Sequence, residues 1–154
     1  MQPILEGCDV SVRSKTGSGK TAAFGIPLVQ GMDPDADQPS LLVMAPTREL
    51  AGQIASELGA IGRHRGVRVV TAYGGAPIGS QIRAIEEGAH VVAGTPGRLL
   101  DLVRRGVLDL TRFKAVVLDE ADEMLSMGFF EDVTALLDGC TSCEQFVILS
   151  ASLE

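Results

Sequence analysis

The chain has 154 residues, of which 45% are hydrophobic and 4% aromatic, so it can bury the core of one domain. No apolar run approaches the ~20 residues that a membrane-spanning helix needs. The first residues lack the basic start and apolar core of a secretion signal, so we expect a cytoplasmic protein. Net charge is −7, but residues 46–114 hold ten of the 13 Lys and Arg and only six of the 20 Asp and Glu. This stretch could meet a polyanion, although a chance imbalance on a solvated face would look the same.

Three cysteines, Cys8, Cys140 and Cys143, are too few and odd in number for a disulfide framework. Cys140 and Cys143 have the spacing of half a zinc site or of a redox pair. Because no second pair and no nearby His supports either alternative, we interpret both as ordinary loop thiols.

Five or six short apolar runs are typical of buried strands. They are rich in β-branched residues and mostly do not alternate with polar ones, which is the pattern of parallel strands covered on both faces. The runs are 10–12, 41–44, 67–70, 91–93, 115–118 and 146–149.

Helical patterns lie between these runs. One helix follows Thr47, a second opens with Thr95 as N-cap and Pro96 in its first turn and closes at Gly106, and a third ends at Gly139. A polar loop with two prolines spans 33–40. Alternating strands and helices predict an α/β three-layer sandwich with an open, mainly parallel sheet.

A glycine-rich loop follows the first strand and precedes a helix that starts near Gly19. The backbone N–H groups of such a loop surround a phosphate, and the helix N-terminus adds a positive dipole end. Lys20 can reach the outer phosphates, and the Thr21 hydroxyl suits Mg²⁺. Ser14 stands where the general pattern has Gly, and a glycine-rich turn without a ligand is the alternative. The candidate nucleotide-binding residues are Ser14, Lys15, Thr16, Gly17, Ser18, Gly19, Lys20 and Thr21.

Acidic residues follow the strand over 115–118, at the sheet end where open α/β sheets bind ligands. Asp119 suits Mg²⁺, which needs only one or two carboxylates besides phosphate oxygens. Glu120 could orient or deprotonate the attacking water, and Asp122 could hold neighbouring loops. The alternative is a favourable acidic first turn of a helix.

These motifs, with the pieces between them, resemble the DEAD-box RNA helicases of helicase superfamily two over nearly all of the chain. The matching segments are 14–21, 46–51, Gly74-Gly75 with Gln81, 95–98, 119–122 with Met124-Leu125 and Gly128-Phe129, and 150–152. The resemblance implies that residues 1–154 form a helicase ATP-binding domain, the first RecA-like domain of such a protein. It also implies ATP and Mg²⁺ as cofactors and catalytic roles for Lys20, Asp119 and Glu120.

The resemblance further implies RNA held by its backbone with low sequence preference. Expected contacts are Pro46, Thr47, Arg48, Gly75, Thr95, Pro96, Gly97 and Arg98, and residues coupling hydrolysis to strand separation are Asp122, Ser150 and Ser152. Arg offers a charged fork to phosphate, while Gly and helix-starting Thr expose N–H groups. A plain helix start at Thr95 and a solvated charge at Arg48 are the alternatives.

The chain departs from the family in three respects. The adenine-reading motif of the family would lie upstream of Met1, and Ser152 replaces Thr. The second RecA-like domain, whose arginines neutralise charge on the transferred phosphoryl group, would lie beyond Glu154. We therefore expect this chain alone to bind nucleotide weakly, to hydrolyse it slowly and not to unwind duplexes, with the second domain of the parent chain as its partner.

Two other functions stay open. A nucleotide-gated RNA clamp without turnover would have no need of Glu120. A different phosphate-loop enzyme, such as a DNA translocase or a small-molecule kinase, fits the motifs at 46–51 and 95–98 less well. Discrimination between RNA and DNA would depend on contacts to the 2′-hydroxyl.

Overall fold

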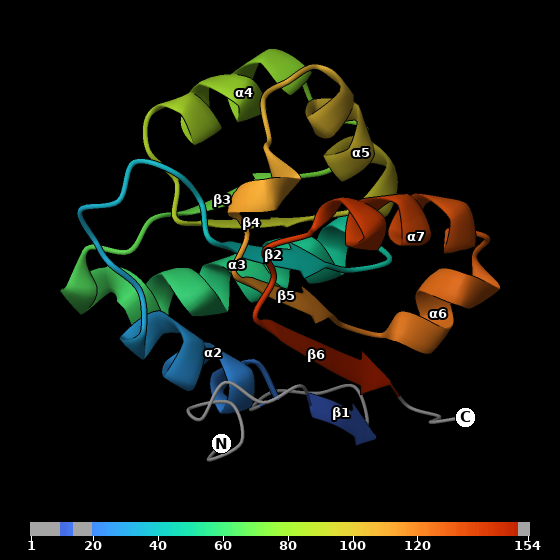
Figure 1. Ribbon diagram of the computed structural model, residues 1–154, viewed down its shortest axis with the longest axis horizontal. Helices are drawn as coiled ribbons and strands as arrows, with labels where there is room; N and C mark the ends of the chain where they lie inside the picture. The colour runs from blue at the N-terminus through green and yellow to red at the C-terminus, as the bar shows by residue number, and fades with distance from the viewer. Residues whose placement is uncertain (1–9, 14–19, 151–154) are drawn as a thin grey trace.

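A computed structural model describes residues 10–13 and 20–150, with side chains from Thr21 onward. Six strands form one sheet in the order β1-β6-β5-β2-β4-β3, and every neighbouring pair is parallel (Figure 1). The strands are β1 (Val10–Arg13), β2 (Leu41–Met44), β3 (Val69–Ala72), β4 (Val91–Gly94), β5 (Ala115–Leu118) and β6 (Gln145–Ser150). The expected open parallel sheet is confirmed.

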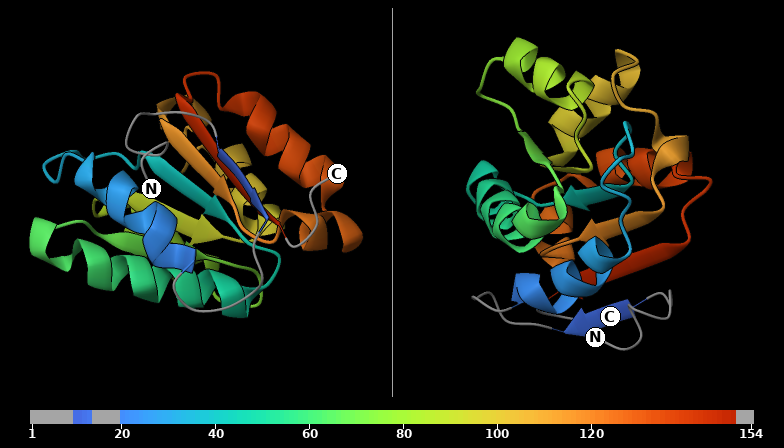
Figure 2. Two further views of the ribbon diagram at one scale, coloured as in Figure 1. Left: turned by 90° about the horizontal axis from the view of Figure 1, so that it is seen from below. Right: turned by 90° about the vertical axis from the view of Figure 1, so that its left-hand side faces the viewer.

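Helices cover both faces of the sheet. They are α2 (Lys20–Gln30), α3 (Arg48–Gly62), α4 (Ile78–Glu86), α5 (Pro96–Arg104), α6 (Ala121–Ser126) and α7 (Phe130–Gly139), with short 3₁₀ turns η1 (Arg63–Arg65) and η2 (Leu110–Arg112). Figure 2 shows α2 and α3 on one side of the sheet and α7 on the other. The three-layer arrangement is therefore confirmed. In the described ranges no helix has both the length and the apolar character needed to cross a membrane.

The core consists of two apolar clusters, one on each face of the sheet. Along β2, Leu42 and Met44 belong to the cluster under α4–α7, whereas Leu41 and Val43 belong to the cluster under α2 and α3. All four side chains are fully buried. Because successive side chains of a strand point to opposite faces, a strand covered on both faces must be apolar throughout.

Two elements differ from the sequence-based expectation. The strand expected over 67–70 begins two residues later, because the backbone of Arg68 is already bound to His90 at both its N–H and its carbonyl. Helix α4 was not predicted, although Ile78, Ile82 and Ile85 recur at helical spacing and pack on the core.

Buried His90 joins three segments of the chain. Its Nδ1 accepts a hydrogen bond from Arg68 N at 2.9 Å, and its Nε2 lies 3.0 Å from the carbonyl oxygen of Pro34. Since Nδ1 accepts, Nε2 carries the proton and donates it to Pro34. The ring thereby fixes the polar 33–40 loop to the start of β3.

We predict that His90→Ala lowers the free energy of unfolding by about 2–4 kcal/mol, because it empties a buried site and leaves the Arg68 N–H without its acceptor. The measurement is chemical denaturation. His64→Ala is the matched control, since His64 is exposed in η1 and its loss should stay within about 0.5 kcal/mol. Equal losses in the two variants would contradict the bridging role of His90.

The two described cysteines lie at the end of α7. Cys140 is its buried C-cap residue, and burial, with a smaller contribution from Cys143, raises the pKa of the Cys140 thiol to about 11. Cys143 is partly exposed and donates to the carbonyl of Gln145 at 3.1 Å. Among the described residues, no group of three or more His, Cys, Asp and Glu side chains gathers to hold a metal ion.

Alkylation of Cys140 should therefore increase about tenfold per pH unit from pH 8 to pH 10, because the thiolate is the nucleophile and its fraction keeps rising until the pKa near 11 is passed. Peptide-resolved mass spectrometry after short exposures to iodoacetamide would measure this rate. A plateau near pH 9, as for an ordinary thiol, would contradict the raised pKa.

Candidate functional site

The carboxyl ends of β1, β6 and β5 lie side by side at one edge of the sheet. Arg13, the last residue of β1, pairs with Ser150, the last residue of β6, and Leu118 of β5 pairs with Ile148. Only β6 therefore separates the end of β1 from the end of β5. The predicted phosphate loop spans 14–21, of which residues 14–19 lie outside the described residues.

Lys20 and Thr21 begin helix α2, and Ser150 ends β6. Helix α2 begins at Lys20, whose side chain is outside the description, and Thr21 in its first turn is buried. Ser150 is also buried. Ser152, the other residue predicted to couple hydrolysis to strand separation, lies outside the described residues.

Asp119 directly follows β5 and is completely buried. Its backbone N–H donates to the carbonyl of Met44 at 2.9 Å, which extends the β5–β2 ladder by one bond. The Asp119 carboxylate and the Thr21 hydroxyl are both buried, and oxygen donors of these kinds are ligands that Mg²⁺ prefers.

Glu120 adopts a left-handed backbone conformation with φ 52° and ψ 52°. It is the single non-glycine residue with positive φ in the described ranges. Such a conformation is costly for a residue with a Cβ, and strained residues of this kind concentrate at functional sites. Asp122, in the first turn of α6, is partly buried.

The predicted RNA-binding residues follow the other three strands, β2, β4 and β3, at the same edge. Ala45 N donates to Gly94 O, and Thr95 N donates to Ala72 O, each at 3.0 Å. These bonds hold the segments after the three strands side by side. The tertiary structure thus brings together segments whose residues are up to 52 positions apart in the sequence, from Pro46 to Arg98.

The two threonines of this edge begin helices in different ways. Thr47 is the N-cap of α3, and its hydroxyl accepts a hydrogen bond from Leu50 N at 3.1 Å. Thr95 is the N-cap of α5, followed by Pro96 as predicted, but its side chain makes no capping bond. The Thr47 hydroxyl thus satisfies one N–H group of α3, whereas the Thr95 side chain satisfies none in α5, and N–H groups at a helix start without a capping side chain suit an anion. Pro46 and Pro96 are buried, whereas Gly97 is exposed.

The two arginines of these motifs have different surroundings. The guanidinium of exposed Arg48 lies over the ring of Tyr73, 5.0 Å from its centroid. Arg98 is partly buried and donates to Ala76 O at 3.2 Å and to Gln81 Oε1 at 2.9 Å. Tyr73 and Gln81 were not predicted as site residues. The sequence signals that could have found them are a single tyrosine beside the glycine pair and a glutamine within the family pattern.

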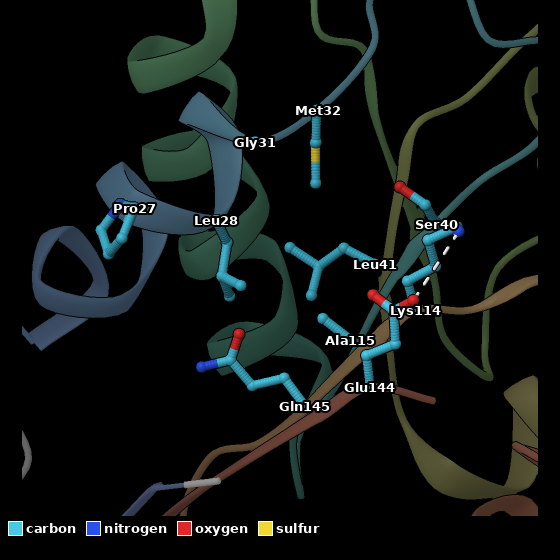
Figure 3. A pocket seen from close by; sticks show the side chains of 10 residues that line it. All are labelled: Pro27, Leu28, Gly31, Met32, Ser40, Leu41, Lys114, Ala115, Glu144 and Gln145. Atoms are coloured by element: carbon cyan, nitrogen blue, oxygen red, sulfur yellow. Dashed lines mark ion pairs between the residues drawn. The ribbon is translucent and has the colours of Figure 1, made fainter. Parts of the chain in front are cut away.

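A pocket of about 240 Å³ lies at the opposite, amino edge of the sheet (Figure 3). It is bounded by the end of α2 and the starts of β2, β5 and β6, and an exposed Lys114–Glu144 ion pair of 4.0 Å crosses its rim. No residue predicted for the site lines it. Because open α/β sheets bind ligands beyond the carboxyl ends of their strands, we locate the functional site at the other edge.

Known proteins resemble the chain over its whole length. The chain is 50% identical over 151 residues to the ATP-dependent RNA helicase DeaD of Escherichia coli (strain K12). The matched segment is 97% of this chain and 24% of that protein. It is 47% identical over 149 residues to the DEAD-box ATP-dependent RNA helicase CshA of Bacillus cereus (strain ATCC 10987 / NRS 248), covering 97% of this chain and 28% of that one. The chain thus spans about a quarter of the length of these curated relatives.

Solved structures agree with the sequence comparison. A DEAD box protein from Methanococcus jannaschii superposes with a TM-score of 0.92 at 39% identity, over 100% of this chain and 43% of that one. A hypothetical ATP-dependent RNA helicase from Sulfolobus tokodaii superposes with a TM-score of 0.90 at 42% identity. That match covers 98% of this chain and 44% of the other. The family model for DEAD/DEAH box helicases matches residues 1–154. With this match and the RecA-like fold described above, the chain belongs to the DEAD/DEAH box helicase family.

Proposed function

We propose that this chain is the ATP-binding and RNA-binding part of an ATP-dependent RNA helicase that remodels or unwinds RNA. One observation carries the proposal: the residues assigned to nucleotide follow β1 and β5, with β6 and its coupling residue Ser150 between them, whereas those assigned to RNA follow β2, β3 and β4. The two groups occupy adjacent halves of the same sheet edge. They meet between β5 and β2, where Asp119 N–H donates to Met44 O.

In the nucleotide half, the backbone N–H groups of 14–19 and the side chain of Lys20 would bind the phosphates of ATP. The Thr21 hydroxyl and the Asp119 carboxylate would hold Mg²⁺, which neutralises phosphate charge when bound. Glu120 would accept a proton from the water that attacks the terminal phosphorus, so that ATP and water give ADP and phosphate. The strained backbone of Glu120 supports this assignment, and it favours an enzyme over a clamp without turnover.

In the RNA half, the Arg48 guanidinium and the N–H groups at the starts of α3 and α5 would contact phosphates. Contacts to the backbone carry no sequence information, so affinity should vary little between RNA sequences. In the complete protein, a second RecA-like domain of the parent chain would close on this edge, and Asp122, Ser150 and Ser152 would relay hydrolysis to the RNA half.

In the parent protein, Lys20→Ala should abolish RNA-stimulated ATP hydrolysis, because the outer phosphates lose their cation. Lys114→Ala is the matched control, since Lys114 is exposed at the amino edge of the sheet and its removal should leave the rate unchanged. The measurement is phosphate release with and without single-stranded RNA. Retained stimulation in the Lys20 variant would refute the phosphate-loop assignment.

Glu120→Gln should lower the ATP hydrolysis rate by about 10²–10⁴-fold while ATP affinity changes little, because a positioned base acts in the transition state rather than on bound substrate. Glu123→Gln, an exposed change in the same helix, serves as control. The two readouts are single-turnover hydrolysis and the Kd for a fluorescent ATP analogue. An equal loss of affinity and rate would show that Glu120 serves binding instead.

A separate measurement distinguishes an RNA helicase from a DNA translocase. Competition between matched RNA and DNA strands for the parent protein, with ATP present, should favour RNA if 2′-hydroxyl groups are contacted. Equal competition would favour the translocase alternative.

A further inference from the structure

We propose that Gln81 and Arg98 form a clamp that positions the 73–77 loop for RNA, and that Arg98 acts through this loop rather than as a phosphate contact. The inference rests on the proposed RNA-binding function, and it assigns different tasks to two arginines that sequence alone treats alike. Gln81 and Arg98 are thus positioning residues, whereas Arg48 and Gly75 touch the RNA.

The clamp is a chain of three hydrogen bonds across two helices and the loop. Gln81 Nε2 donates to Tyr73 O at 3.0 Å, at the first residue of the loop. Arg98 Nη1 donates to Gln81 Oε1 at 2.9 Å and to Ala76 O at 3.2 Å. Helix α4 carries Gln81 and helix α5 carries Arg98, so both ends of the glycine pair are tied to rigid elements.

Buried Gln81 uses both ends of its amide in this chain, the N–H₂ on a loop carbonyl and the oxygen on Arg98. Leucine would keep the volume and lose both bonds. Glutamate would keep the acceptor for Arg98 and lose the donor to Tyr73. The residue type is therefore set by its two partners.

The glycine pair at the centre of the loop has no side chains whose packing could replace these bonds. Gly74 and Gly75 are both exposed, and an added Cβ on Gly74 would meet no atom within 4 Å. Gly75 has φ 84°, a left-handed conformation that glycine adopts readily in the unfolded chain among many others. Without the clamp this segment would sample many conformations, and ordering it on RNA would weaken binding.

The same loop positions the proposed phosphate contact Arg48. The carbonyl of Tyr73 is bound by Gln81, and its ring lies under the Arg48 guanidinium. A Cβ on Gly75 would come within 3.4 Å of Arg48 Nη1, so the loop backbone also lies against this arginine. Arg48 is exposed, whereas both N–H groups of Arg98 Nη1 are already bound to protein acceptors.

The first test needs no RNA. Backbone ¹⁵N relaxation of this chain should give order parameters near 0.85 for residues 74–76, falling below about 0.6 in both Gln81→Leu and Arg98→Ala. Arg83→Ala, which removes an exposed charge from the same helix as Gln81, should leave them unchanged. A loop that stays ordered in both variants would overturn the clamp.

The second test compares binding of a fluorescent oligouridine across a salt series. Gln81→Leu and Arg98→Ala should each weaken binding about tenfold, the scale of one buried hydrogen bond, and the double variant should be little worse than either. The two single variants should also share one salt slope. If Arg98 instead contacts phosphate, the affinity losses of the two single variants multiply in the double variant. The plot of log affinity against log salt concentration is then also less steep for Arg98→Ala than for Gln81→Leu, by about 0.7.

The two tests separate this inference from the function on which it rests. Absence of oligouridine binding by the unaltered protein would overturn the proposed RNA-binding function, while loss of loop order in both variants would still support the clamp. Multiplying losses together with unequal salt slopes would overturn the positioning role of Arg98 and leave RNA binding intact.

Discussion

The parallel direction of all six strands is the constraint on which the site depends. In a parallel sheet every carboxyl end meets the same edge, so the segments after the strands become neighbours whatever their distance along the chain. Backbone bonds just beyond the strands then hold these segments in register. Asp119 is tied to Met44 of β2, Ala45 to Gly94 of β4, and Thr95 to Ala72 of β3.

This arrangement divides one edge into two halves with a shared boundary. The bond from Asp119 N to Met44 O lies at that boundary, two residues before Pro46 and beside the strained Glu120. This bond joins the acidic segment after β5 directly to the strand that precedes residues 46–51.

Buried polar groups determine the details that apolar packing leaves open. His90 fixes the 33–40 loop to the start of β3, and Gln81 connects Tyr73 to Arg98. His90 uses both ring nitrogens, and Gln81 uses both its amide nitrogen and its amide oxygen. Pairing of this kind is the condition under which burial of a polar side chain is tolerated. The two arginines of the edge differ in their partners, since Nη1 of Arg98 is bound to two protein acceptors, whereas Arg48 is exposed and lies over the Tyr73 ring.

The sequence by itself determined the strands over 41–44 and 115–118 and the helix after Thr47, because these follow from local periodicity and capping. The order of its motifs carried the resemblance to the helicase family. Tertiary structure alone decided the late start of β3, the left-handed backbone of Glu120 and the pairing of Arg98 with Gln81, 17 residues away, and with Ala76, 22 residues away. The physical reason is that these features depend on which side chains of different elements meet. That meeting is set by the packing of α4 and α5 on the sheet, and no local pattern encodes it.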